Sequence, residues 1–283
     1  MITEQTNDFV KPLSFFRPKK RLGQNFLVAK KAISRIISVA DLKKTDVVME
    51  IGPGLGAITK ELAGYVKKVI AVEKDKELAK TLQGLLECWN VRNVEVIPQD
   101  ILELQVSSYK LQEYKVIGNL PFYITYHVIR KFAESRTPPK LMVFVAQKEV
   151  GERICAKPPN MSKPAVFTQF YAKPEIKGKI KRTCFYPQPK VDSAILKITP
   201  VDKFQRFNLW NFPKGDLTTK MEKVVSAGFS HPRKQLANNL SKELKIPKPI
   251  VENWLRKNNI SPSQRAETLR VEDWINLTKS LKF

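Results

Sequence analysis

Residues 47–147 alternate short apolar runs with amphipathic stretches, and this alternation constrains the fold more than any other feature. The apolar runs are strand-like and cover residues 47–52, 68–73, 94–100, 114–120 and 141–147. Stretches with helical spacing lie between or after them, near residues 58–66, 75–86, 125–133 and 148–155. Such runs predict a parallel sheet covered on both faces by helices. Right-handed crossovers then predict a doubly wound α/β domain.

The pattern changes after residue 155. Residues 164–172 indicate a helix, and strand-like alternation lies on both sides of a proline-rich turn at 186–192. From about residue 205 onward, basic stretches with helical spacing predict a small all-α domain. We therefore expect residues 1–204 to form an N-terminal arm with a catalytic domain, and residues 205–283 to form a helical domain.

The charge balance indicates a polyanionic partner. The chain has 50 basic and 27 acidic side chains, for a net charge of +23. Residues 32–173 are nearly balanced, with 21 basic and 15 acidic side chains, whereas residues 174–283 have 22 and 10. Because Lys and Arg displace counterions from phosphates, we expect the flanks to bind nucleic acid. The alternative is a basic protein without such a partner.

The cysteines and histidines give no metal-binding pattern. Cys88, Cys155 and Cys184 are far apart and odd in number, and the only histidines are His127 and His231. We therefore expect no bound metal and no disulfide framework, but reduced thiols in a cytoplasmic protein. The N-terminal sequence predicts neither a signal peptide nor a membrane span.

Three glycines, Gly52, Gly54 and Gly56, separate the first predicted strand from the helix that follows it. Glycine allows a sharp turn and a close approach of a ligand, and the start of the helix offers free N–H groups. The spacing matches neither the dinucleotide fingerprint nor a P-loop. The glycines alone are equally compatible with a plain tight turn.

Acidic residues follow the next two predicted strands. Glu73 ends the second strand and Asp100 ends the third, and ligands of open α/β sheets bind at the carboxyl ends of the strands. Glu73 could accept hydrogen bonds from both hydroxyls of a ribose, and Asp100 could accept one from the amino group of an adenine. Helix caps or solvated loop charges are the alternatives for each acid. With the glycine turn, they favour an adenosine ligand without phosphates, and S-adenosylmethionine fits.

The fourth predicted strand ends in Asn119-Leu120-Pro121-Phe122, which resembles the N-L/I-P-Y/F signature of the ribosomal RNA adenine dimethyltransferases. Phe122 stands where this family often has tyrosine, which keeps the ring but not the hydroxyl. Further segments resemble motifs of this family in the same order, at residues 21–27, 50–59, 71–75, 98–102, 185–198, 229–240 and 263–269. The resemblance spans nearly the whole chain, and the last two segments favour the bacterial small-subunit branch.

The resemblance implies a Rossmann-like class I SAM-dependent methyltransferase sheet with a small C-terminal all-α domain that binds RNA. It also implies an enzyme that dimethylates N6 of two adjacent adenosines near the 3′ end of small-subunit (16S) rRNA, in late subunit biogenesis. The methyl donor would be S-adenosylmethionine. The expected partner is rRNA within an immature 30S-type subunit, and the enzyme would be a cytoplasmic monomer.

The resemblance also implies roles for individual residues. Contacts with the cofactor are expected from Gln24, Asn25, Leu27, Gly52, Gly54, Glu73, Lys74, Asp100, Ile101 and Asn119. Methyl transfer is expected at Asn119, Leu120, Pro121 and Phe122, and stacking on the target base at Phe122, Phe185 and Tyr186. Core packing is the alternative for Phe185 and Tyr186. RNA contacts are expected from Lys19, Lys20, Arg21, Lys190, Arg233 and Lys234, although most lysines on such surfaces are merely solvated.

Other functions remain open from the sequence. One is an Erm-type methyltransferase that acts on large-subunit rRNA. Another is a ribosome-assembly factor that binds RNA without activity, although the intact Glu73, Asp100 and Asn119 disfavour it. A DNA adenine methyltransferase would need a target-recognition region that the sequence does not show.

Overall fold

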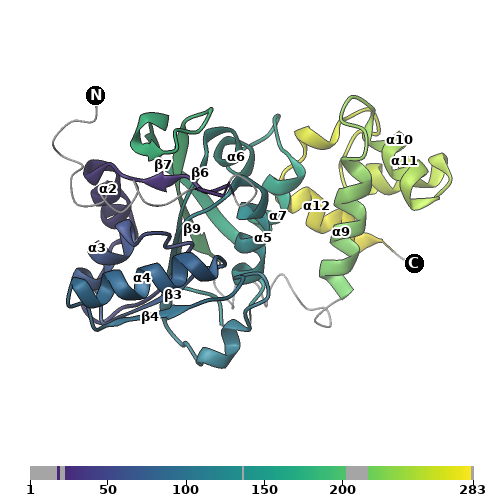
Figure 1. The fold of residues 1–283 in the computed structure, drawn as a ribbon. Coiled ribbons are helices and arrows are strands. Elements are labelled where there is room, and N and C mark those ends of the chain that lie inside the picture. Colours follow the sequence, from purple (N-terminus) through teal and green to yellow (C-terminus); the bar gives the residue numbers. More distant parts are fainter. Residues whose placement is uncertain (1–17, 20–22, 136, 202–215, 282–283) are drawn as a thin grey trace. The chain divides into compact units, whose positions relative to one another are not determined.

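A computed structural model of the protein describes residues 18–19, 23–135, 137–201 and 216–281. The chain divides into two compact units. The first comprises residues 1–151 and 174–200, and the second comprises residues 152–173 and 201–283. The first unit is an α/β fold and the second is mainly helical (Figure 1).

A seven-stranded sheet in the order β4-β3-β2-β5-β6-β9-β7 forms the centre of the first unit. Its strands are β2 (Val47–Ile51), β3 (Lys68–Val72), β4 (Val94–Ile97), β5 (Tyr114–Asn119), β6 (Leu141–Gln147), β7 (Ala172–Ile180) and β9 (Ser193–Pro200). Strands β2 to β6 pair in parallel, and β9 pairs antiparallel with β6. The predicted doubly wound sheet is confirmed. The strand order reverses between β2 and β5, which is where such sheets bind ligands.

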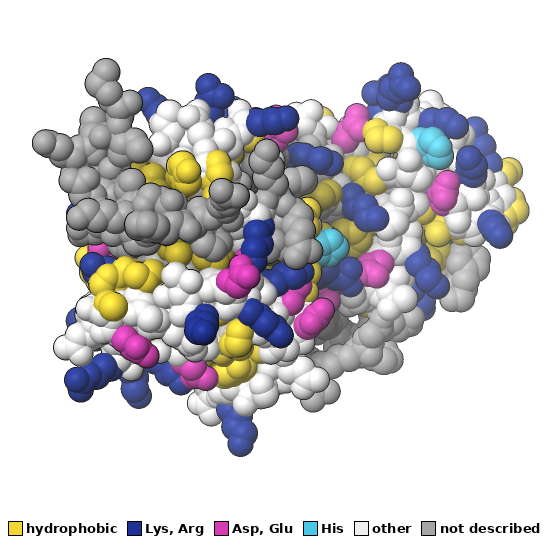
Figure 2. Space-filling model, in the orientation of Figure 1, with side chains coloured by type: hydrophobic (Ala, Val, Ile, Leu, Met, Phe, Trp, Pro, Cys, Tyr) yellow, Lys and Arg dark blue, Asp and Glu magenta, His cyan; other side chains and the backbone are white. Residues whose placement is uncertain are grey.

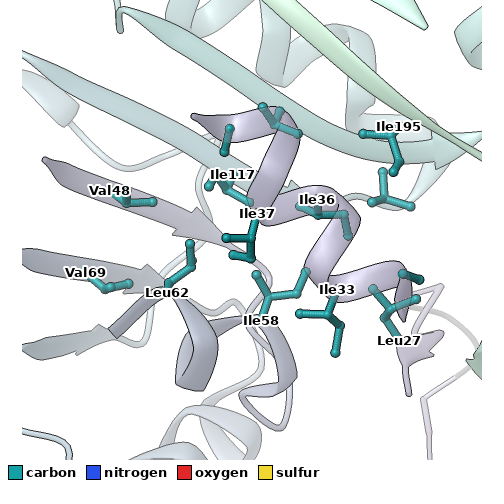
Figure 3. Packing of buried hydrophobic residues seen from close by; sticks show 14 of the residues in the cluster. Leu27, Ile33, Ile36, Ile37, Val48, Ile58, Leu62, Val69, Ile117 and Ile195 are labelled. Carbon is teal, nitrogen blue, oxygen red and sulfur yellow. The ribbon is translucent and has the colours of Figure 1, made fainter. Parts of the chain in front are cut away.

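One face of the sheet is covered by α2 (Lys30–Ala40), α3 (Ala57–Tyr65) and α4 (Lys76–Cys88). Ile36 and Ile37 of α2 are buried in one cluster with Val48, Ile117 and Ile195 of the sheet (Figure 3). The sequence analysis did not predict α2. Its apolar residues nevertheless recur every three or four positions on one side of the helix, which is the signal that could have identified it.

The opposite face of the sheet is covered by α5 (Phe122–Ala133). The ring of Tyr114 on β5 lies 6.3 Å from that of Phe132 on α5. Because Tyr114 is three residues from Ile117, the two side chains point to opposite faces. The predicted cover on both faces is therefore confirmed. A short helix, α6 (Lys148–Ile154), continues directly from β6.

A second, two-stranded sheet joins β1 (Phe26–Leu27) to β8 (Phe185–Tyr186). It was not predicted, because strands of two residues are too short to show an alternating pattern. The pairing is antiparallel and aligns Phe26 with Tyr186 and Leu27 with Phe185. It brings the predicted N-terminal cofactor motif to the predicted base-stacking residues.

The second unit contains α7 (Lys163–Tyr171), α9 (Asp216–Gly228), α10 (Leu236–Leu244), α11 (Lys248–Lys257) and α12 (Val271–Ser280). These are the helices that the sequence predicted. Trp274 of α12 is fully buried and stacks on Phe229 at 5.5 Å between ring centroids. A Cβ atom on Gly228 would lie 2.3 Å from the Trp274 ring, so the end of α9 fits closely against α12.

The division into units differs from the predicted boundary at residue 204. Residues 152–173, which include α7, group with the C-terminal helices. Contacts of α7 with α9 and α12 account for this grouping. Among the residues that the structure describes, no helix combines the length and the apolar character needed to cross a membrane.

Candidate active site

A cavity of about 450 Å³ lies in the first unit, where β2, β3 and β5 end in Ile51, Val72 and Asn119. It is lined by every residue predicted to contact the cofactor: Gln24, Asn25, Leu27, Gly52, Gly54, Glu73, Lys74, Asp100, Ile101 and Asn119. Leu120, Pro121 and Phe185 also line it. The fold thus gathers residues from four strand ends and the N-terminal segment into one site.

The glycine turn forms the floor of the cavity between β2 and α3. Gly52, Gly54 and Gly56 all have positive φ values, of 65°, 59° and 83°. A Cβ atom on Gly54 would lie 2.9 Å from the ring of Phe26, and one on Gly56 would lie 2.6 Å from Leu82. Both the backbone conformation and the close packing therefore require glycine here.

Glu73 holds the glycine turn in place. Its Oε2 accepts a hydrogen bond from the backbone N–H of Gly54 at 3.1 Å, and its Oε1 accepts one from Asp75 at 2.9 Å. The residue is 7% exposed. Burial raises the pKa of Glu73, although the backbone hydrogen bonds oppose that shift. Each oxygen still has a lone pair that a ribose hydroxyl could use.

Asp75 connects Glu73 to the N-terminal segment. Its side chain caps α4 by accepting from the N–H of Glu77 at 3.1 Å, and it also accepts from Gln24 Nε2 at 3.1 Å. Lys19 Nζ lies 2.9 Å from Asp75 Oδ2 and 2.7 Å from Glu77 Oε2. Burial alone would raise the pKa of Asp75, but the bonds from Lys19 and Gln24 lower it. The Asp75 carboxylate thus links the N-terminal segment, which lines the cavity through Gln24, to the end of β3 beside Glu73.

Asp100 lies at the other end of the proposed nucleoside site, in the loop after β4. Its Oδ1 accepts from the N–H of Leu102 at 2.9 Å, and its Oδ2 lies 2.7 Å from Lys74 Nζ. Burial would raise the pKa of Asp100, but the Lys74 ammonium and the Leu102 N–H lower it. Lys74 thereby holds a negative charge at the position predicted for the adenine amine.

Asn119 is the last residue of β5 and presents its side chain to the cavity. Its Nδ2 donates to the carbonyl oxygen of Asn25 at 2.8 Å. Because that oxygen can only accept, the bond orients the amide so that Oδ1 remains an acceptor. The N–H of Leu120 is bound to the carbonyl of Val145 at 3.0 Å, and Pro121 caps α5 with a φ of −55°. The turn is therefore held on both sides of the asparagine.

The sequence matches the family described as Ribosomal RNA adenine dimethylase over residues 15–282. The chain belongs to this family. Its fold, enzyme class and use of S-adenosylmethionine are those expected from the sequence resemblance.

Relatives of the dimethylase share most of its length. The chain is 38% identical over 263 residues to the Ribosomal RNA small subunit methyltransferase A of Dehalococcoides mccartyi. The aligned region covers 92% of this chain and 87% of the relative. It is 36% identical over 290 residues to the protein of the same name from Bacillus mycoides, covering 98% and 95%. Among solved structures, the 23S rRNA methyltransferase ErmE matches with a TM-score of 0.68 and 27% identity, covering 90% of this chain and 99% of that chain.

The residues of the dimethylase cavity fit S-adenosylmethionine. Gly52 and Gly54 line the cavity without side chains, and a Cβ atom on Gly52 would meet only the carbonyl oxygen of Asn119 at 3.6 Å, which suits a ligand bound against the main chain. Glu73 and Asp100 provide carboxylates near the ends of β3 and β4, as a ribose and an adenine amine require. Among the described residues, no group of three or more His, Cys, Asp or Glu could hold a metal ion.

The predicted base-stacking residues of the dimethylase have different positions. Phe185 is buried and lines the cavity, whereas Tyr186 is 46% exposed and does not. The two are consecutive on β8, so they point to opposite sides. The structure does not describe the side chain of Phe122. Of the two described rings, that of Phe185 lines the cavity and also packs in the buried cluster with Leu27, so its stacking on a base stays a prediction.

The predicted RNA-binding residues are spread over the chain. Lys190, Arg233 and Lys234 are exposed, whereas Lys19 is paired with two acids. Lys20 and Arg21 lie outside the described residues. Figure 2 shows Lys and Arg side chains over much of the face that it draws. The site assignments for RNA remain predictions.

Sequence reasoning missed several residues of the site. Gln147, Ser193 and His127 line the cavity: Gln147 ends β6, Ser193 begins β9, and His127 lies in the middle of α5. Glu50 on β2 precedes the cavity-lining Ile51 and is 1% exposed, and its Oε2 has no hydrogen-bond partner among the described residues. Burial, with the nearby charge of Glu73, raises the pKa of Glu50 to about 8. A carboxyl group inside an apolar strand was the available signal for Glu50.

Proposed function

We propose that this dimethylase transfers two methyl groups to N6 of each of two adjacent adenosines near the 3′ end of small-subunit rRNA. The relatives of 36–38% identity, which share nearly its full length, are named small-subunit rRNA methyltransferases. The observation that supports the chemistry is the Asn119 amide, which lines the cavity and donates through Nδ2 to Asn25, so that its Oδ1 remains an acceptor.

Asn119 acts by positioning the amine. The N6 lone pair of adenine is delocalised into the ring, so the amine is a poor nucleophile until it becomes pyramidal. Hydrogen bonds from N6–H to Asn119 Oδ1 and to the Leu120 carbonyl favour that geometry and stabilise the positive charge that develops on nitrogen. Pro121 keeps the turn rigid because its φ is fixed. No strong base is needed, since the proton leaves after the new bond has formed.

S-adenosylmethionine supplies the methyl group from a sulfonium, which keeps the electron pair of the broken C–S bond. In the proposed arrangement, Glu73 accepts hydrogen bonds from the ribose of S-adenosylmethionine, and Asp100 accepts one from the amine of its adenine. The glycine turn would contact its methionine part. Phe185 stacks on the target base after it leaves the RNA helix. Each of these roles uses a side chain or backbone that lines the cavity.

The proposed substrate form is rRNA within an immature small subunit, and the proposed enzyme is a cytoplasmic monomer. Exposed basic side chains, such as Lys190, Arg233 and Lys234, would bind phosphates and make association depend on salt. The structural similarity to ErmE is compatible with the large-subunit alternative. The sequence identity to ErmE, 27%, is however lower than the 38% identity to a small-subunit methyltransferase.

The test is to incubate the protein with methyl-labelled S-adenosylmethionine and either immature small subunits or large subunits, and to map the label. We expect N6,N6-dimethyladenosine at two adjacent positions near the 3′ end of the small-subunit rRNA. Label in large-subunit rRNA would instead support the Erm-type activity. Absence of dimethyladenosine in both would refute the enzymatic proposal and leave an RNA-binding role.

A further inference from the structure

Two polar side chains of the cavity lack a hydrogen-bond partner in the part of the chain that the structure describes. Gln147 is the last residue of β6 and Ser193 is the first residue of β9, and both line the cavity. Neither side chain makes a hydrogen bond to any residue that the structure describes. Ser193 is nevertheless only 7% exposed. Polar groups in such a place are normally satisfied by a ligand or by water.

The strand register places these side chains on the same face as Asn119. Asn119 is aligned with Val145 of β6, and Gln147 lies two residues further along that strand. Gln147 is in turn aligned with Ser193 of β9. Because side chains alternate along a strand, Asn119, Gln147 and Ser193 project from one face of three adjacent strands.

The same face carries the apolar core further down the strands. Ile117, Val145 and Ile195 precede or adjoin the three polar residues and are buried in the cluster under α2. Figure 3 shows Ile117 and Ile195 of the sheet near Ile37 and Ile36 of that helix. On each of these strands the polar residue lies at the cavity and the apolar residue two positions away lies in the core. The polar side chains of this face are therefore located at the cavity.

The spacing suits a purine. Strands lie about 4.8 Å apart and rise about 3.3 Å per residue, so the Cα atom of Gln147 is roughly 8 Å from that of Asn119. An antiparallel partner such as Ser193 lies about 5 Å beyond. A planar base whose amine reaches Asn119 therefore has its neighbouring ring edge within reach of a glutamine side chain.

We propose that Gln147 and Ser193 recognise the target adenine by donating hydrogen bonds to a ring nitrogen beside N6. Adenine carries an acceptor on each side of its amine, N1 and N7, and the carboxamide N–H and the hydroxyl are donors. Guanine has an oxygen in place of N6, which would face the Asn119 acceptor. This specificity role rests on the proposed N6 methylation at Asn119.

The test combines variants with base analogues. Small-subunit rRNA is assembled with 1-deazaadenosine or 7-deazaadenosine at the target positions, and kcat/KM for methyl transfer is measured. The wild-type protein should be about 10-fold to 100-fold slower on the analogue that lacks the recognised nitrogen. Gln147→Met, which keeps the size but removes the donor, should lose a similar factor on adenosine and show no further loss on that analogue. Ser193→Ala should show a smaller loss of the same kind.

Affinity for S-adenosylmethionine should stay unchanged in both variants, which separates loss of base recognition from damage to the cofactor site. Gln112→Met is the matched control, because Gln112 is exposed beside the opposite end of β5. The inference is overturned if the wild-type protein methylates both analogues as fast as adenosine. It is also overturned if Gln147→Met and Ser193→Ala keep full activity on adenosine. If the wild-type protein itself transfers no methyl group to N6, the proposed function fails first.

Discussion

Acidic side chains at the cavity are bound to specific partners, whereas Arg233 and Lys234 of the helical unit are exposed and have no ion pair among the described residues. Glu73 and Asp100 each accept at least one backbone hydrogen bond. A held charge has a fixed position and can recognise one group of a ligand. An exposed charge attracts any phosphate, and its effect depends on the number of such charges and on salt. Substitutions in the two regions should therefore have different effects.

The largest effect is expected at Asn119. Asn119→Ala removes the acceptor for the N6 amine, so methyl transfer should fall by about 1,000-fold or more. RNA binding should remain nearly intact, because this side chain is inside the cavity rather than on a charged surface. Single-turnover methylation and filter binding measure the two properties. A parallel loss of RNA binding would show that the role of Asn119 is misassigned.

The glycine turn should be the next most sensitive feature. Gly54→Ala forces a Cβ atom to within 2.9 Å of Phe26 at a positive φ, which should destabilise the fold by at least about 1–2 kcal/mol and weaken binding of S-adenosylmethionine. Gly84→Ala in α4 is the matched control, since a Cβ atom there meets nothing within 4 Å. That variant should be more stable by about 0.5–1 kcal/mol. Titration calorimetry measures the affinity of each variant for S-adenosylmethionine, and urea unfolding measures its stability.

Glu50 should make stability depend on pH. Its pKa is about 8 in the fold and near 4.5 without the fold, so the folded state binds the additional proton between these values. Stability from this group is fully present below about pH 4.5 and is lost as pH rises towards 8. Glu50→Gln should remove that loss and unfold at higher urea than the wild type at pH 8. Equal slopes of stability against pH in the two proteins would contradict a protonated Glu50.

The smallest effect is expected in the helical unit. Arg233→Ala with Lys234→Ala should weaken RNA binding several-fold and reduce the slope of log K against log salt by about one per lost phosphate contact. Affinity for S-adenosylmethionine should not change. Lys68→Ala is the control, because Lys68 is paired with Glu95 at 2.6 Å at the start of β3. An unchanged salt slope in the double variant would remove these two residues from the RNA surface.

Much of the site could be predicted because its residues follow local signals. Each of Glu73, Asp100 and Asn119 ends or follows an apolar run, and the ends of parallel strands meet at one edge of a sheet. Helix α2 was missed although its spacing is regular, and β1 and β8 were missed because two residues show no period. Gln147 and Ser193 were missed because their shared face depends on the register of β6 with β9, which no local pattern encodes.

By itself, the sequence determined the series of strands and helices in residues 47–147, the position of the glycine turn and the residues at the strand ends, because hydrophobic periodicity and backbone freedom are local properties. The tertiary structure alone decided which distant segments meet. It aligned residues 26–27 with 185–186, joined Lys19 and Gln24 to Asp75, and buried Glu50 so that its pKa rises. Long-range pairing and burial are properties of the packed chain, because each depends on the whole core rather than on neighbours in sequence.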